Sequence, residues 1–387
     1  MKMRSAKFIL LTIAACVVSG VALWAQAPSS QTDSANPNWT STTDSRNGDA
    51  DPIRTVESHS QSGNRSIDKQ TVERRGDDGG FAPYQDIEKE TVQVDADTVR
   101  TTTRTFTRNP DGAKQLVEVV EEEKHSAGTD LTVVRSTSDP DVNGNLQVIR
   151  RQTEQTTKTS PNVEEIKTTV QLPDLNGGLA AAVKVEEHRE RSSDGGANGA
   201  VESKKTTLLP DGAGNWQVGE IRRTTIAQDG DHRTTDERVF LPDSEGKIGE
   251  ISHTITNATE SASGEKLDTV ETYSTSIPGA VPDGRLHLVE RDITAQQTSA
   301  TGQQVTQQRV EQANPGDPAS GLQVVTVTIE TVRPGDSGAQ ATRTIQARDA
   351  NGSLPVISVD TTKSDNLHAI QVQIAPSPSD APKKEAK

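Results

Sequence analysis

Leu208-Leu209-Pro210-Asp211-Gly212-Ala213-Gly214-Asn215-Trp216-Gln217-Val218 is the clearest copy of a turn that recurs along most of this chain. Apolar residues lead into a Pro-Asp-Gly turn, and apolar residues follow it. Proline presets φ at the first corner, aspartate hydrogen-bonds to nearby backbone, and glycine accepts a positive φ. The stretch therefore predicts two antiparallel strands joined by a tight turn.

The same turn returns at a nearly constant spacing of about 34 residues, which is typical of repeat architectures. Its closing glycines are Gly80, Gly112, Gly144, Gly177, Gly214, Gly246, Gly284, Gly321 and Gly352. A second row of turns, such as Ala127-Gly128 and Asp229-Gly230, lies halfway between them. The segments between turns span about 9–13 residues rich in Thr, Val, Ile, Arg and Glu, which favours strands. Nine such two-strand units predict roughly eighteen strands in an antiparallel meander.

Apolar residues cluster beside the Pro-Asp-Gly turns, as in Val239-Phe240-Leu241, whereas the far strand ends are polar, as in residues 151–158. We therefore expect an apolar stripe, including Trp216, near one edge of an all-β, elongated or gently curled open sheet. Strand spacing gives a ribbon about 85 Å long and about 40 Å wide. An outer-membrane barrel is the rival fold, but aromatic girdles and lipid-facing alternation are missing. A β-propeller is disfavoured because its strands are shorter.

Two of the turns also resemble part of a known repeat. Asp141-Val142-Asn143-Gly144-Asn145-Leu146 and Asp349-Ala350-Asn351-Gly352-Ser353-Leu354 are similar to the D-x-x-G-x-L half of the YD repeat of RHS-type shell proteins. The resemblance covers a few residues of each unit. It implies an array of β-hairpins and implies nothing about activity.

The amino-acid composition limits the size of the hydrophobic core and the kinds of partner that the protein can bind. The 387 residues are 30% hydrophobic and 2% aromatic, which suits a repeat array better than one large core. The net charge is −15, and removal of the basic residues Lys2, Arg4 and Lys7 with a leader would leave −18. Bulk electrostatics therefore disfavour binding to nucleic acid or anionic lipid.

The N-terminus predicts export. Residues 1–27 combine a basic start, the apolar run from Phe8 to Trp24 and the cleavage site Ala25-Gln26-Ala27, so we expect a signal peptide. An alternative is a lipoprotein in which Cys16, the single cysteine, is lipidated. Residues 28–56 are expected to be a disordered linker, 57–374 the hairpin array and 375–387 a disordered tail. The mature chain is expected to be secreted or periplasmic, without disulfides or a membrane span.

Several short motifs resemble parts of known functional sites. Asp139 to Gly144 fits the opening of a calcium loop, but Arg150 occupies the position of the closing acid, so a plain Asx-type turn is expected. Gly335-Asp336-Ser337-Gly338 matches a serine-protease nucleophile motif without a matching histidine segment upstream. The seven histidines show no metal-pair spacing. We therefore predict no catalytic, cofactor-binding or metal-binding residues, no cofactor, and no enzymatic activity.

These observations favour an exported, non-catalytic β-repeat protein that acts as a structural or adhesive element of the cell envelope or the extracellular space. The alternative is a periplasmic ligand-binding module that uses the repeat sheet or its row of turns. The expected partner is an envelope or extracellular protein or polymer, since a long polar sheet face is the main surface that the sequence predicts.

Overall fold

The computed structural model describes residues 38–47, 52–76, 79–109, 111–192, 200–276, 283–314, 317, 320–335 and 338–364. The chain divides into two units, residues 1–36 and 37–387, and all described residues belong to the second. The predicted signal peptide with Cys16 and the predicted tail at 375–387 lie outside the described residues. No helix in the described part of the chain is long and apolar enough to cross a membrane.

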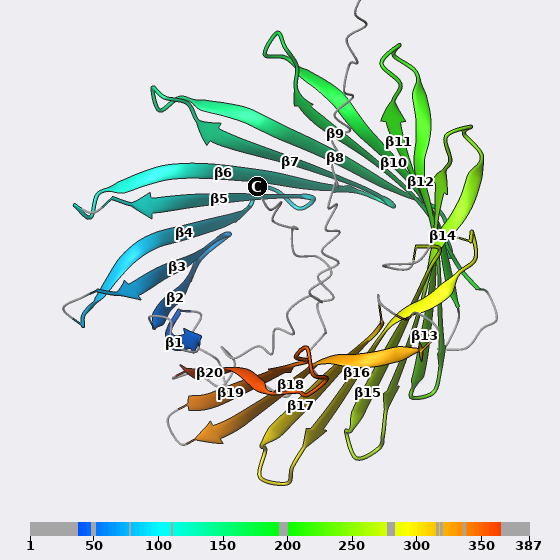
Figure 1. Cartoon of the computed structure of the whole chain (residues 1–387). Coiled ribbons are helices and arrows are strands. Elements are labelled where there is room, and N and C mark those ends of the chain that lie inside the picture. The colour runs from blue at the N-terminus through cyan, green and yellow to red at the C-terminus, as the bar shows by residue number, and fades with distance from the viewer. Residues whose placement is uncertain are drawn as a thin grey trace, which may run out of the picture. The chain divides into compact units, whose positions relative to one another are not determined.

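The described residues form strands joined by short turns (Figure 1). The strands are β1 Trp39–Asn47, β2 Ile53–Ser62, β3 Arg65–Arg75, β4 Phe81–Gln93, β5 Thr98–Arg108, β6 Lys114–Ala127, β7 Asp130–Pro140, β8 Leu146–Ser160, β9 Val163–Pro173, β10 Leu179–Arg191, β11 Val201–Pro210, β12 Trp216–Asp229, β13 His232–Pro242, β14 Ile248–Glu260, β15 Lys266–Ser274, β16 His287–Thr298, β17 Gln304–Ala313, β18 Leu322–Gly335, β19 Gly338–Ala347 and β20 Val356–Ser364.

The strands make one antiparallel sheet of 20 strands, and the sheet closes on itself. Each strand pairs with the next along the chain, and β1 also pairs with β20 through Thr43–Asn47 and Asp360–Ser364. Figure 1 shows the resulting ring. The predicted antiparallel meander is confirmed, but the predicted open or curled sheet is wrong, because the molecule is a closed β-barrel.

The barrel begins earlier in the sequence than expected. β1 and the start of β2 lie within residues 28–56, which were expected to be a disordered linker. β1 pairs with both β2 and β20, so this segment supplies the strand that closes the ring. Its sequence, Trp-Thr-Ser-Thr-Thr-Asp-Ser-Arg-Asn, has little apolar content, and its strand conformation follows from pairing on both edges.

The Pro-Asp-Gly turns share one hydrogen-bonding arrangement. The Asp141 Oδ1 atom accepts hydrogen bonds from the backbone N–H of Asn143 at 2.8 Å and of Asn145 at 2.9 Å. Asp211 repeats this pattern with the next residues of its own turn. Gly144 has a φ of 83°, which an L side chain rarely adopts. The Asx-type turn expected at Asp139–Gly144 is therefore confirmed.

Each Pro-Asp-Gly hairpin also contains a β-bulge, which the sequence analysis did not predict. The extra residue lies on the strand that follows the turn. These residues are Tyr84, Val117, Ile149, Ala182, Gly219, Ile251, Val289, Val325 and Ile357. A bulge bends its strand and increases the local twist, and bulges are common at barrel rims. Their repetition at one end of every hairpin supplies the curvature that a flat ribbon lacks.

Candidate functional site: the inner wall of the barrel

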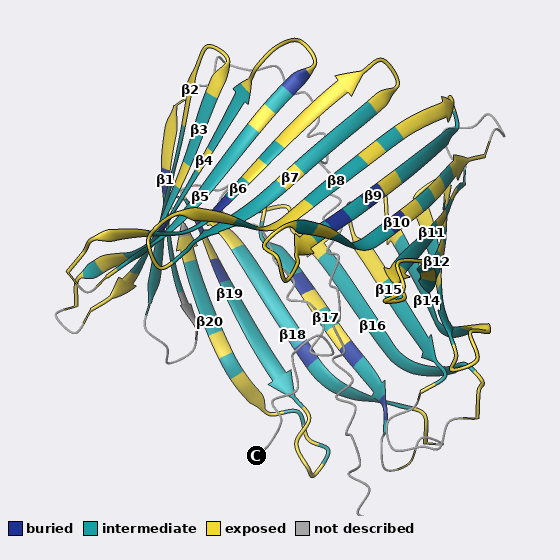
Figure 2. Cartoon of the chain, turned by 90° about the horizontal axis from the view of Figure 1, so that it is seen from above, coloured by how far each residue is buried: buried dark blue, intermediate teal, exposed yellow. Residues whose placement is uncertain are grey.

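Strand register divides the side chains into two continuous faces, and burial identifies the inner one. On β9, Thr168 and Val170 are buried whereas Lys167 is exposed, and on β17, Thr306 and Val310 are buried whereas Gln307 is exposed. A curved sheet crowds the side chains on its concave face, and eight of the thirteen buried residues in the described chain share the face of Thr168 and Thr306, so this face lines the inside of the ring. Figure 2 shows buried and exposed residues alternating along these strands.

The ring is too wide for side chains to fill. Strands about 4.8 Å apart, tilted by about 40° from the barrel axis, give a 20-stranded barrel a backbone diameter of about 40 Å. Side chains about 6 Å long on opposite walls leave a space about 28 Å wide along the axis. The inner face is therefore the wall of a lumen, and its polarity decides what the lumen can hold.

One sector of this inner wall, from β6 to β13, pairs its charges across strands. The Arg135 Nε atom donates to Glu122 at 2.8 Å, and Arg222 donates to Glu237 at 2.6 Å. Further ion pairs join both Lys158 and Arg189 to Glu164 of β9. We call this the ion-paired sector. Its acidic and basic groups alternate between neighbouring strands, so its local net charge is small.

The opposite sector, from β15 to β19, carries acidic groups with few cations, and we call it the acidic sector. Asp268, Asp292 and Glu330 lie on its inner face, and none of them forms an ion pair with another described residue. Arg343 pairs in register with Glu330, but its Nε atom is buried without a hydrogen-bond partner, as is Oδ1 of Asp292. A small hollow lies here between Thr306, Gln308, Thr328, Glu330 and Arg343.

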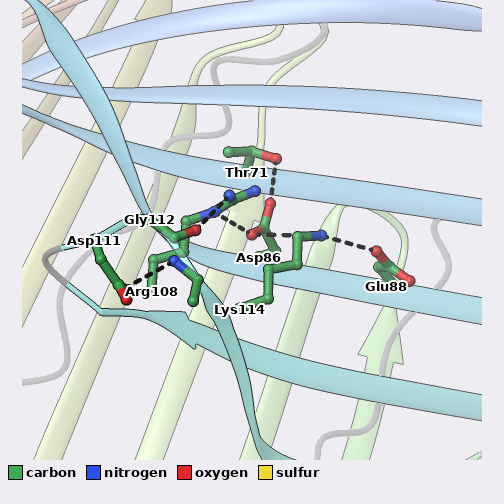
Figure 3. A network of polar contacts seen from close by, with 8 residues as sticks. Thr71, Asp86, Glu88, Arg108, Asp111, Gly112 and Lys114 are labelled. Carbon is green, nitrogen blue, oxygen red and sulfur yellow. Dashed lines mark hydrogen bonds and ion pairs between the residues drawn. The ribbon is translucent and has the colours of Figure 1, made fainter.

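The outer face has an apolar zone at the end of the barrel that carries the Pro-Asp-Gly turns. We call this outer zone, together with the turns themselves, the turn rim. The outward Phe106 ring lies there, with the Lys114 ammonium group 5.3 Å from its centre. Beside it, Asp86 is 4% exposed and accepts hydrogen bonds from Thr71 and Arg108, both at 2.8 Å (Figure 3). This network uses both carboxylate oxygens of Asp86 and ties β3, β4, β5 and β6 together.

The sequence analysis placed Phe240 and Trp216 in one apolar stripe beside the turns, but it did not include Phe81 and Phe106. Register places all four aromatic residues on the outer face near the turn rim. A signal was present, because each lies within a few residues of a Pro-Asp-Gly turn. Trp216 lies beside its turn as expected and pairs with Pro210.

The remaining sequence motifs do not assemble into a catalytic or metal site. Within the described residues, no group of three or more His, Cys, Asp or Glu side chains could hold a metal ion. His59, His188 and His253 each contact a carboxylate on a neighbouring strand. Positions 336 and 337 of the Gly335–Gly338 motif lie outside the described residues.

Several solved protein structures are similar to this chain. OpdL of Pseudomonas aeruginosa is 8% identical, with a TM-score of 0.37, and the match covers 84% of this chain and 96% of that one. A BenF-like porin from Pseudomonas fluorescens is 10% identical, with a TM-score of 0.36 and coverages of 84% and 97%. A loop-deletion mutant of OmpT, an outer membrane protein of Vibrio cholerae, is 8% identical, with a TM-score of 0.28 and coverages of 85% and 100%.

The solved structures that it resembles include a BenF-like porin. No family model and no curated protein matches the chain. These identities and TM-scores are too low to transfer an activity, and the ring closure stands on the chain's own strand pairing.

The functional expectations from the sequence need correction. A secreted or periplasmic protein without a membrane span, acting as a structural or adhesive sheet or as a ligand-binding module, does not agree with these findings. The described residues form a closed barrel of 20 strands instead of an open sheet. The open sheet face on which those expectations depended does not exist, because its two edges pair with each other.

Proposed function

We propose that this chain forms a membrane channel whose lumen lets water-soluble solutes pass. The observation that supports the proposal most strongly is the pairing of β1 with β20, which encloses a lumen wider than side chains can fill. The inner wall is polar and charged in both sectors, so the lumen holds water.

The strands have the number and length that such a channel needs. A strand tilted by about 45° crosses a bilayer core with about 9–11 residues, and these strands contain 9 to 15 residues. An even number of antiparallel strands and a closed ring without free edges are typical of transmembrane barrels. Closure also satisfies the edge N–H and C=O groups, which lipid cannot do.

Several charged residues on the outer face are paired across strands. Arg100 contacts Glu123 at 2.7 Å, and Arg65 contacts Glu90 at 2.7 Å. Charged groups at membrane depth are costly, and pairing with one another is the usual way in which proteins retain them. The pairing of these charges is therefore compatible with a membrane-facing wall. The apolar residues of the outer face are concentrated at the turn rim.

The direct test is conductance in a planar lipid bilayer, measured on the folded chain without its leader. We expect discrete steps of current, and a folded barrel that inserts without conducting would contradict the proposal. A matched pair of variants on β8 assigns the current to the lumen. Gln152 lies on the inner face and Gln155 on the outer face of the same strand.

In a cysteine-free background, we expect a positively charged thiol reagent to change the conductance of Gln152→Cys and to leave that of Gln155→Cys unchanged. Equal effects at both positions, or an effect at Gln155→Cys alone, would mean that the current does not pass through the lumen.

A further inference from the structure

Large apolar side chains are exposed at the turn rim far more than at the opposite end of the barrel. Val142 and Leu175, at the tips of two Pro-Asp-Gly turns, are 101% and 106% exposed relative to their reference states. Other exposed apolar residues of this rim are Leu146, Ile149, Ile248, Val356, Ile357 and Val359. Exposed apolar groups that gather in one zone usually mark a contact surface.

Cations accompany the aromatic rings of the same rim. The Lys184 ammonium group lies 4.4 Å from the centre of the Trp216 ring, and the Arg223 guanidinium lies 5.1 Å from that of Phe240. Arg54 lies 4.1 Å from the centre of Phe81 in the same way. Aromatic rings with adjacent cations are suited to the headgroup region of a bilayer, where one part of the side chain is wet and the other is apolar.

We propose that the turn rim is seated in the headgroup region of a phospholipid bilayer. The exposed apolar residues come from the hairpins β7–β8, β9–β10, β13–β14 and β19–β20. The rings of Phe81, Phe106 and Trp216 add the hairpins β3–β4, β5–β6 and β11–β12, so the zone extends around most of the ring. Such a ring fits a planar apolar phase that surrounds the barrel, whereas a protein partner of ordinary size would cover a one-sided patch. The cations beside the rings meet the phosphate groups of the same lipids.

The proposal rests on the proposed function in placing the barrel at a membrane, and it adds which residues anchor one end of the barrel among the lipid headgroups. The opposite end differs in its chemistry. Its exposed large apolar residues include Trp39, which is 46% exposed and stacks on His59 with ring centres 6.1 Å apart. Register places Trp39 on the inner face, away from surrounding lipid.

Trp39 and Trp216, the two tryptophans within residues 28–387, allow a test of depth. Trp39→Phe leaves Trp216 as the fluorophore, and Trp216→Phe leaves Trp39. In phosphatidylcholine vesicles with brominated acyl chains, we expect strong quenching of Trp216 from bromine near the headgroups and weak quenching of Trp39. Equal quenching, or stronger quenching of Trp39, would overturn the proposal.

A second test uses the exposed turn tips, where substitution leaves the packing unchanged. We expect Val142→Asp with Leu175→Asp to lower binding to phosphatidylcholine vesicles by about tenfold or more, because two apolar side chains leave the lipid. Asn143→Asp with Asn176→Asp adds the same charge to the same turns, and we expect it to bind nearly as well as the parent.

The outcomes of these tests separate the two proposals. Conductance that persists in a barrel whose Trp216 is not quenched would overturn the turn-rim proposal alone. Quenching of Trp216 in a folded barrel that never conducts would support the turn-rim proposal and contradict the channel. A concentration-dependent dimer in solution, abolished by Val142→Asp with Leu175→Asp, together with unchanged vesicle binding, would identify a second copy of the chain as the occupant of the rim.

Discussion

Single aspartates organise the turns at the residue scale. In Asp211 the side-chain hydrogen bond from Asn215 and the backbone hydrogen bond from Ala213 stabilise the carboxylate, so they lower the pKa of Asp211 from its ordinary 3.8. The pKa of Asp141 is lowered in the same way, chiefly by the backbone N–H of Asn145. The sequence predicted this chemistry because Asp, Asn and Gly favour such turns for local reasons.

We expect Asp211→Ala to lower the thermal midpoint of the barrel near neutral pH. A carboxylate whose folded pKa lies below 3.8 stabilises the fold fully above pH 3.8, and the contribution disappears as the pH falls through the folded pKa. The difference in thermal midpoint between parent and variant should therefore be constant above about pH 5 and shrink below pH 3.8. A difference that grows on acidification would contradict this account.

The aromatic residues of the turn rim show what residue-level analysis missed. Phe106 and Phe240 lie in different hairpins, more than one hundred positions apart, and strand register places them on the same face at the same end of the sheet. A sequence shows local turn chemistry directly, but it does not show which hairpins become neighbours around an axis. The aromatic residues are therefore scattered in the sequence, and the apparent lack of an aromatic girdle disfavoured a barrel in the sequence analysis.

At the scale of the element, the β-bulges explain why the predicted ribbon curves. Ile149 and Ile251 are extra residues in hairpins that otherwise pair regularly. Their side chains are β-branched and apolar, like those of the paired strand residues beside them, so composition does not distinguish a bulge from regular pairing. The number of strands was underestimated for a related reason, because β1 has the composition of a polar linker.

The pairing of β1 with β20 can be tested with a disulfide. Ser45 and Thr362 are register partners across this junction, so their Cα atoms lie within the range that a disulfide needs. We expect Ser45→Cys with Thr362→Cys, in a Cys16→Ser background, to form an intramolecular disulfide under mild oxidation. Mass spectrometry of the linked peptides and faster migration of the unfolded chain on a gel would show it.

The control places the second cysteine further along the same strand. Ser358 lies four residues from Thr362, or about 13 Å along β20, so Ser45→Cys with Ser358→Cys should stay reduced. If both pairs oxidise equally, or neither does, β1 does not pair with β20 in the register described.

At the scale of the whole molecule, the charge of the lumen is uneven. The acidic sector holds Asp268, Asp292 and Glu330, whereas the ion-paired sector is nearly neutral. The Debye length is about 30 Å at 0.01 M salt and about 3 Å at 1 M. The field of the acidic sector therefore reaches across a lumen about 28 Å wide only when the salt concentration is low.

We expect reversal potentials in a salt gradient to show cation preference near 0.01 M and almost none near 1 M. Asp292→Asn with Glu330→Gln should reduce the preference at low salt. Glu123→Gln removes a negative charge from the outer face and should leave the preference unchanged. An anion preference at low salt, or an equal effect of Glu123→Gln, would contradict this assignment.

The regular placement of one bulge in every Pro-Asp-Gly hairpin has a consequence for how such a barrel can change over evolutionary time. Because each hairpin carries its own turn and its own curvature, duplication or loss of one unit alters the strand number by two and leaves the junction of β1 and β20 intact. Each added hairpin widens the circumference by about 12 Å and the diameter by about 4 Å. Pore calibre can therefore change in discrete steps through gene duplication, without the redesign of any existing strand.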